Sequence, residues 1–469
     1  MKWTSSYRTL PRMFYQDVLP SVAKDPSFVL WNESLAEQLQ LTDWHDETGL
    51  LKLSGAQLDD HWEPLAQAYM GHQFGHLTML GDGRAILLGE LETERGIVDL
   101  QLKGSGQTPF SRRGDGRAGL GPMLREYVMS EALFHLNIPT TRSLAVIETG
   151  ETVWRERPHR GALVVRVASS HLRVGTFQYA YHYGTIDDVK TLADYAIQKH
   201  YPHVDNAKNR YISLFREVMK RQAALIAKWQ AVGFIHGVMN TDNMTISGET
   251  IDYGPCAFMN QYDPDTVFSS IDAQGRYAYG RQPQIGGWNL ARFVETLLPL
   301  FGEGEEGLEI AQRELNAYGP LFEHYWLQEM RKKLALREGE EALLDELFVC
   351  MRREQRDWTE TFRDLTVKNE EGLQLERSEE MKDWYVKWQQ PTKGREQELQ
   401  KMQEVNPAFI PRNYLVDQAI ERMELTNDRT LLERLLQLSR EPFAYTEEQL
   451  AYRLPEEEKT RRHQTFCGT

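Results

Sequence analysis

The sequence predicts an α+β fold of two lobes with a cleft between them. Strand signals dominate the early part of the chain, where short apolar runs alternate with polar residues between about 85 and 167. From Ile186 onward the hydrophobic periodicity becomes helical and largely stays so. Strands that precede helices, rather than alternating with them, are typical of α+β proteins.

The overall composition limits the function classes. Hydrophobic residues make up 41% and charged residues 26% of 469 residues, which are values typical of globular proteins. A net charge of −15 argues against non-specific binding to nucleic acid or to anionic membranes. Three cysteines, Cys256, Cys350 and Cys467, do not make a disulfide framework. With no apolar segment of membrane-spanning length, we expect a soluble, cytoplasmic monomer with no nucleic-acid or membrane partner.

Four regions are expected along the chain. Residues 1–68 mix aromatic residues with one short helical pattern and are expected to form an extension packed on the first lobe. Residues 69–180 form the first, strand-rich lobe and residues 181–365 the second, helical lobe. Residues 366–469 form a helical C-terminal region with a charged link near 391–398.

Lys103 directly follows a predicted strand, residues 97–102. It lies on the face opposite the apolar one, because Val98, Leu100 and Leu102 alternate with polar residues. Taken alone it reads as a surface lysine, but glycines and arginines follow it. The motif Gly81-Asp-Gly-Arg84 recurs as Gly114-Asp-Gly-Arg117, and glycines allow the backbone to approach a phosphate closely. Neither a P-loop nor a Rossmann glycine motif is present.

Two arginines and two glutamates of this lobe are candidates for ion pairs. Arg166 interrupts an apolar strand pattern and Arg173 follows it, so each needs an anionic partner, either a carboxylate of the protein or a ligand phosphate. Pro122 fits the first turn of a helix that carries Glu126 and Glu131. Either glutamate could pair with Lys103, and the alternative is that both are solvated.

Residues 234–254 contain the acidic candidates. His236, Asn240, Asp242 and Asn243 lie in a short loop after a long helical pattern, and a hairpin-like pair, residues 244–247 and 250–251, is expected to deliver Asp252. One carboxylate could then accept a proton while the other binds a metal ion, for which the neutral oxygen of Asn243 is also suited. The simpler reading is a polar turn. Separately, His72 and His76 have a zinc-like spacing, but Gly75 and the lack of a third ligand argue against a zinc site.

The order of Lys103, a helix glutamate, Asp242 and Asp252 resembles that of protein kinases. Several stretches together resemble one family more closely, the selenoprotein O (SelO) family of kinase-like protein adenylyltransferases, over nearly the whole chain. The stretches that carry the resemblance are residues 69–75, 80–84, 102–106, 111–117, 124–132, 166–177, 234–254, and Asn406 with 412–415.

The resemblance implies a protein-kinase-like two-lobed fold and AMP transfer from ATP to Ser, Thr or Tyr hydroxyls of proteins, with Mg²⁺ or Mn²⁺ and ATP inverted relative to kinases. It implies that Asp242 is the proton acceptor and that Asn243 and Asp252 bind the metal. The positions that match the family's nucleotide-binding residues are Gly81, Gly83, Arg84, Lys103, Asp115, Gly116, Arg166, Arg173 and Asp252, with Glu126 steadying Lys103. Uridylyl transfer from UTP with Mn²⁺ is implied as a further activity.

Two departures from related patterns matter. The kinase H-R-D is absent, because Gly237 and Val238 follow His236, and this disfavours a kinase that transfers the γ-phosphate. A pseudokinase that holds ATP without turnover is a further alternative. Eukaryotic members of the family end in a Cys-x-x-selenocysteine pair, whereas Cys467 has no vicinal partner, so we expect a free terminal thiol.

Overall fold

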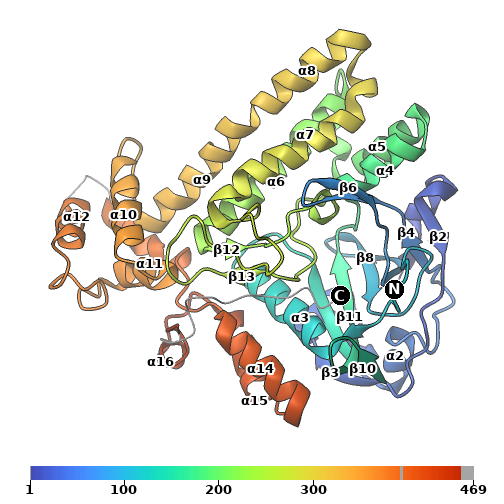
Figure 1. Ribbon diagram of the computed structural model, residues 1–469, viewed down its shortest axis with the longest axis horizontal. Coiled ribbons are helices and arrows are strands. Elements are labelled where there is room, and N and C mark those ends of the chain that lie inside the picture. Colours follow the sequence, from blue (N-terminus) through green and yellow to red (C-terminus); the bar gives the residue numbers. More distant parts are fainter. Residues whose placement is uncertain (1, 391–394, 456–469) are drawn as a thin grey trace.

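A computed structural model describes residues 2–390 and 395–455, so the expectation about Cys467 falls outside the described residues (Figure 1). A nine-stranded sheet is followed by a large helical half. The prediction of an α+β fold is confirmed at this level. Within the described ranges, no helix combines the length and the apolar character needed to cross a bilayer.

All strands of the large sheet pair in antiparallel fashion, in the order β2-β4-β7-β8-β11-β10-β3, with β1 beside β7 and β9 beside β11. The strands are β1 (Lys2–Thr4), β2 (Tyr15–Asp17), β3 (Ser27–Trp31), β4 (Leu65–Gln67), β7 (Ala85–Thr93), β8 (Gly96–Lys103), β9 (Ala118–Gly119), β10 (Arg142–Trp154) and β11 (Pro158–Ala168). Four of them (β1, β2, β3 and β4), with the helices α1 (Glu33–Leu39) and α2 (Glu47–Leu53), come from the first 68 residues. The N-terminal segment therefore extends the sheet itself.

The two faces of β8 have different neighbours, as the alternation of its residues predicts. Leu100 and Leu102 pack in a hydrophobic cluster with Trp44 and Leu35 from the N-terminal segment. Lys103 therefore lies on the opposite face, next to the helix α3 (Leu120–His135). Helix α3 crosses this second face of the sheet and contacts β10 and β11.

The helical half is built around α6 (Arg210–Val232), which is capped by the side chain of Asn209 and ends at Gly233, whose φ of +71° lies in the left-handed region favoured by glycine. Its buried face packs against α7 (Gln282–Phe301) and α9 (Tyr318–Leu334). The helices of this half are α4 (Val174–Tyr183), α5 (Ile186–His200), α7 (Gln282–Phe301), α8 (Gly304–Asn316), α9 (Tyr318–Leu334), α10 (Ala342–Arg353) and α11 (Trp358–Val367).

The C-terminal region divides into two parts that pack on different halves of the molecule (Figure 1). Helix α12 (Glu379–Gln389) packs beside α10, and α13 (Arg395–Lys401) beside α9. The chain then returns to the sheet, where α14 (Asn413–Thr426) and α15 (Thr430–Arg440) pack on α3. A last short helix, α16 (Glu447–Leu450), follows them.

One local expectation is wrong. Residues 244–251 do not form a hairpin; instead Thr245 makes an isolated bridge with Arg173, and Thr250 with Thr140. The tertiary partners outcompete local pairing here because the segment lies between the two halves of the molecule. His72 and His76 lie on a separate hairpin of β5 (Met70–Gln73) and β6 (His76–Met79), where His72 bonds to Gln178, so the helical zinc spacing does not arise.

Candidate active site

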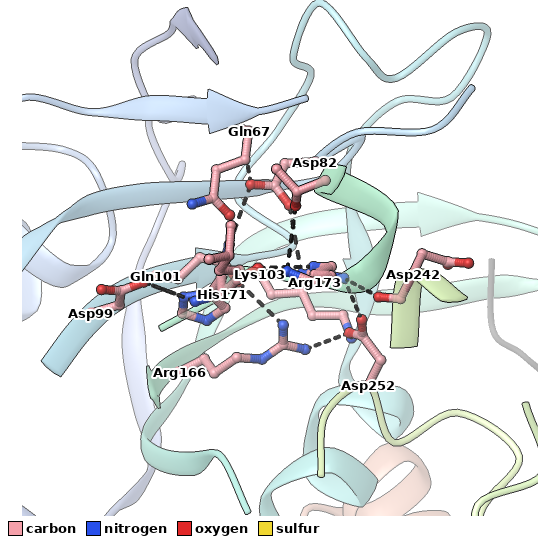
Figure 2. A network of polar contacts seen from close by, with 12 residues as sticks. Gln67, Asp82, Asp99, Gln101, Lys103, Arg166, His171, Arg173, Asp242 and Asp252 are labelled. Carbon is pink, nitrogen blue, oxygen red and sulfur yellow. Dashed lines mark hydrogen bonds and ion pairs between the residues drawn. The ribbon is translucent and has the colours of Figure 1, made fainter. Parts of the chain in front are cut away.

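Three cationic side chains converge on Asp252 (Figure 2). Lys103, the last residue of β8, places its Nζ 2.7 Å from Oδ1 of Asp252. Arg166 of β11 donates to the same oxygen at 2.6 Å. Arg173, at the start of α4, donates to Oδ2 at 3.0 Å. The antiparallel register sets Arg166 opposite Gln101, two positions before Lys103, so both cations leave the same face of the sheet.

Glu126 is the second carboxylate of this network. It accepts from Lys103 at 2.7 Å and from Nε of Arg166 at 2.8 Å. Burial alone would favour the protonated form, but the charges of Arg166 and Lys103 hold the pKa of Glu126 below its usual value. Glu131, the other candidate, pairs with Arg142 at 2.6 Å. The partners of Arg166 are therefore the carboxylates of Glu126 and Asp252 and the amide oxygen of Gln101.

Asp252 lies in a strained and closely supported backbone position. Its φ is +64°, in the left-handed region that non-glycine residues adopt only at some cost. The His236 ring lies with Nε2 2.8 Å from the carbonyl of Ile251, and Gly254 N donates to the Asp252 carbonyl at 3.0 Å. Burial opposes ionisation, yet the charges of Lys103, Arg166 and Arg173 hold the pKa of Asp252 well below its usual value.

A second buried network restrains the side chain of Arg173 (Figure 2). Arg173 Nε donates to the carbonyl of His171 at 3.2 Å, and Asp99 accepts from His171 N at 3.0 Å. Lys199 of α5 in turn donates to Asp99 at 2.7 Å. The ring of Tyr69 lies 4.4 Å from the guanidinium carbon of Arg173. These contacts leave Arg173 little rotational freedom, so its charge is fixed in place.

Asp242 lies beside this cluster but takes no ion pair from it within the described residues. It belongs to the short 3₁₀ helix η5 (Thr241–Asn243). Arg173 donates at 3.0 Å to its main-chain carbonyl, and Oδ1 of its carboxylate is buried with no hydrogen-bond partner among the described residues. Burial raises the pKa of Asp242 to about 7, against the lowering effect of Arg173. A carboxyl group with this pKa is suited to accept a proton near neutral pH.

Gly71 of β5 makes the close environment of Asp242 possible. A Cβ atom at Gly71 would lie 2.0 Å from Oδ1 of Asp242. On the same hairpin, His72 N donates to Oγ1 of Thr241 at 2.8 Å. The β5–β6 hairpin therefore covers the Asp242 carboxylate with backbone.

Asp82 is a member of the cluster that the residue pattern did not single out. It is buried beside Arg173, with 3.8 Å between Oδ1 and Nη2, and accepts from Gln67 N at 3.0 Å. Burial raises its pKa to about 6. The repeat of the Gly-Asp-Gly-Arg motif could have drawn attention to it. The corresponding Asp115 lies at the outer rim instead, where Arg155 pairs with it at 2.8 Å.

One cavity of about 760 Å³ joins all the predicted site residues. Its lining also includes Asp417, Ile420 and Glu424 of α14, which no sequence motif connected with the site. Glu424 accepts from Gly121 N at 3.2 Å, which fixes α14 to the start of α3. The predicted residues in the lining are Gly81, Gly83, Arg84, Lys103, Asp115, Gly116, Glu126, Arg166, Arg173, Asp242, Asn243 and Asp252.

The oxygen atoms that Asn243 and Asp252 could offer as ligands make only part of the shell that a hard divalent cation needs. Asn243 donates through Nδ2 to the Val238 carbonyl at 2.9 Å, and no described residue donates to its Oδ1. An amide oxygen and a carboxylate are suitable ligands for Mg²⁺ when phosphate and water complete the shell. Elsewhere in the described residues Cys350, Glu354 and Glu380 lie close enough together to hold an ion. There, however, Arg356 and Arg353 already pair with the two carboxylates.

We predict that Asp242→Asn stabilises the protein at pH 8. The folded pKa of about 7 lies above the ordinary value of 3.8, so ionised Asp242 destabilises the fold most above pH 7 and less as the pH falls towards 4. The shift corresponds to at most about 4 kcal/mol. The Tm of the variant should exceed that of the wild type at pH 8, by a margin that shrinks at pH 5. The exposed Asp345→Asn is the control, and a lower Tm for Asp242→Asn at pH 8 would contradict the prediction.

Comparison with known proteins shows the family of this chain. The family model described as protein adenylyltransferase SelO matches residues 1–440. The chain is 54% identical over 476 residues to the protein nucleotidyltransferase YdiU of Anoxybacillus flavithermus, covering 99% of this chain and 98% of that protein. It is 53% identical over 479 residues to the YdiU protein of Geobacillus kaustophilus, covering 100% and 99% of the two chains. The chain therefore belongs to the SelO family.

Proposed function

We propose that this chain transfers the AMP group of ATP to serine, threonine or tyrosine hydroxyls of proteins and releases pyrophosphate. The family and the names of its relatives support protein nucleotidyl transfer. The observation that carries the proposal is the placement of Asp242, a buried carboxylate with a pKa of about 7, beside three fixed cations in one cavity. Such a site can accept a proton and balance phosphate charge at the same time.

The architecture we propose is kinase-like, with lobes at residues 69–180 and 181–365, an extension at 1–68 and a C-terminal region at 366–469. The 2.7 Å contact of Lys103 with Glu126 supports it, because kinases use a strand lysine paired with a helix glutamate. The position of Asp252, reached from the helical half, supports it as well. The site then lies where the sheet meets the helical half.

For the nucleotide, we propose that Lys103, Arg166 and Arg173 bind the phosphates that leave as pyrophosphate. Arg84 and Asp115 line the same cavity, and the backbone at Gly81, Gly83 and Gly116 offers close approach. Gly81 and Gly116 have φ values of +81° and +66°, which glycine adopts readily. Three fixed cations exceed the single lysine of a kinase, and this supports an inverted triphosphate with the α-phosphate nearest Asp242.

In the proposed chemical step the acceptor oxygen forms a bond to the α-phosphorus, and the bond from that phosphorus to the oxygen bridging to the β-phosphate breaks. Asp242 accepts the hydroxyl proton. Pyrophosphate leaves with its charge balanced by the neighbouring cations. Asp242 must be ionised to accept the proton. We therefore expect kcat/KM, which reports ionisations of the free enzyme, to rise with pH through about 7.

Asn243 and Asp252 are the proposed ligands of Mg²⁺ or Mn²⁺. A bound divalent ion would supply charge neutralisation to the phosphates. Asp252 forms ion pairs with Lys103, Arg166 and Arg173. We infer that bound phosphate groups share the charge of these fixed cations and so weaken their hold on the oxygens of Asp252.

Two other functions remain as outcomes of the test. A kinase would transfer the γ-phosphate, and a pseudokinase scaffold would bind ATP without turnover. Use of UTP in place of ATP with Mn²⁺ is an extension of the proposed activity. The cations that we propose to bind the phosphates would not distinguish one base from another.

The decisive measurement is the intact mass of acceptor proteins, and of the enzyme itself, after incubation with ATP and Mg²⁺ or Mn²⁺. We expect addition of AMP. Asp242→Ala should slow the transfer by about 100-fold or more while ATP still binds, because the proton acceptor is lost. The same substitution at an exposed position, Asp345→Ala, is the matched control. A product that carries only phosphate would identify a kinase, and unmodified protein with bound ATP would identify a scaffold.

A second prediction follows from the ion pairs of Asp252. Mn²⁺ should bind the protein alone about tenfold or more weakly than it binds the protein saturated with a non-hydrolysable ATP analogue, after correction for Mn²⁺ held by the analogue itself. The paramagnetic signal of free Mn²⁺ measures both constants, and Asp252→Asn should remove the difference. Equal affinities would show that the cations do not compete with the metal.

A third prediction concerns Gly71. Gly71→Ala should lower transfer by about 100-fold, because the new methyl group displaces the Asp242 carboxylate from its place. Gly319→Ala is the control, since nothing lies within 4 Å of a Cβ there. Unchanged transfer in Gly71→Ala would mean that the position of the carboxylate is not critical.

A further inference from the structure

The segment that follows Asp252, residues 256–260, is held along one edge by the helical half. Its strand β13 (Ala257–Phe258) pairs with β12 (Phe234–Ile235), just before the Asp242 loop. Met259 N donates to the Gly233 carbonyl at 2.7 Å. This small sheet has two strands, so the second edge of β13 needs other partners for its backbone groups.

The side chain of Asn413, the first residue of α14, occupies that second edge. Phe258 N donates to Oδ1 of Asn413 at 3.2 Å, and Nδ2 of Asn413 donates to the Phe258 carbonyl at 2.9 Å. One amide group therefore satisfies both backbone groups of Phe258, as a neighbouring strand would. Asn413 is only 3% exposed, so water does not compete for these bonds.

Arginines hold both ends of the same segment. Arg412, fully buried, donates to Oδ1 of Asn260 at 2.9 Å and pairs with Asp357 at 2.8 Å. At the other end Arg125 of α3 donates to the Cys256 carbonyl at 3.4 Å. Arg125 also pairs with Asp417 of α14. The start of α14 thus fixes residues 256–260 relative to α3.

We propose that the start of α14 is a brace that positions Asp252, with Asn413 as its central positioning residue. The inference rests on the proposed function of Asp252. Three residues, Tyr253, Gly254 and Pro255, join Asp252 to the braced segment, and proline limits the freedom of this link. Helix α3 carries Glu126, the partner of Lys103, so one element sets the relative position of both carboxylates of the cluster.

The geometry also explains why the brace lies on α14. A Cβ at Gly121 would come within 3.0 Å of Glu424 and Ile420, so the two helices approach closely at the start of α3. Displacement of α14 would therefore move residues 256–260 and release the Arg125 contact together. Asp252, already at a φ of +64°, would lose the backbone support that holds it opposite the cations.

The test compares Asn413→Ala with Asn406→Ala, a matched loss of a buried asparagine. Asn406 lies in the same region, is 0% exposed and bonds to Lys333 and Thr366, and its hydrogen bonds in the described part of the chain do not reach residues 256–260. The measurements are the Tm, hydrogen exchange of the peptide spanning Asp252 and Phe258, binding of Mn²⁺ in the presence of the ATP analogue, and the rate of nucleotidyl transfer.

We expect both variants to lower the Tm, but only Asn413→Ala to weaken Mn²⁺ binding by about tenfold and to speed exchange at residues 252–260. Asn413→Asp keeps the acceptor for Phe258 N and should fall between Asn413→Ala and the wild type. Equal Mn²⁺ binding and exchange in Asn413→Ala and Asn406→Ala would overturn the brace. If the wild type transfers no nucleotide, the proposed function fails, while Mn²⁺ binding and exchange still decide whether the brace exists.

Discussion

The structure depends on keeping three buried cations in place around two carboxylates. Lys103 and Arg166 come from adjacent strands, Arg173 from the start of a helix, and Glu126 and Asp252 from two further elements. A buried charge that loses its partner strongly destabilises the fold. Each of these elements must therefore hold its charged side chain in place, because the charges it pairs with would otherwise be buried without a partner. The sheet, α3 and the loop after α6 are therefore fixed relative to one another by charge as well as by packing.

Asp242 shows the opposite treatment of a carboxylate within the same cavity. Asp252 is surrounded by cations and has a pKa held well below its usual value, whereas Asp242 has its carboxylate covered by the hairpin backbone and its pKa raised to about 7. Two aspartates ten residues apart thus acquire different protonation behaviour from their surroundings alone. Such separation of pKa values is the usual way to give two carboxylates different tasks.

Much of the strand-rich half could be predicted from the sequence because strand alternation is a local signal. The strand face on which Lys103 lies, opposite the apolar residues, follows from residue periodicity. The need of Arg166 for an anionic partner follows from its apolar surroundings, and the helix that carries Glu126 follows from the local pattern. The choice of Glu126 over Glu131 rested on the family resemblance, since both are helix glutamates. Residues 244–251 were mispredicted as a hairpin, because their partners, Arg173 and Thr140, lie far away in the chain. Asp82 and the α14 residues were missed for the same reason, since their place in the cavity depends on tertiary packing.

The packing of α14 and α15 on α3 has a consequence for how the chain is made. Phe409, Leu415, Leu432 and Leu435 belong to the same hydrophobic cluster as Leu124 and Val128 of α3 and Val146 of the sheet. During synthesis, the residues of α3 and the sheet leave the ribosome about 300 residues before their partners in α14 and α15 do. Until then, an apolar face of α3 and the sheet lacks its partners. The strand-rich half therefore completes its core only after α14 and α15 have been made.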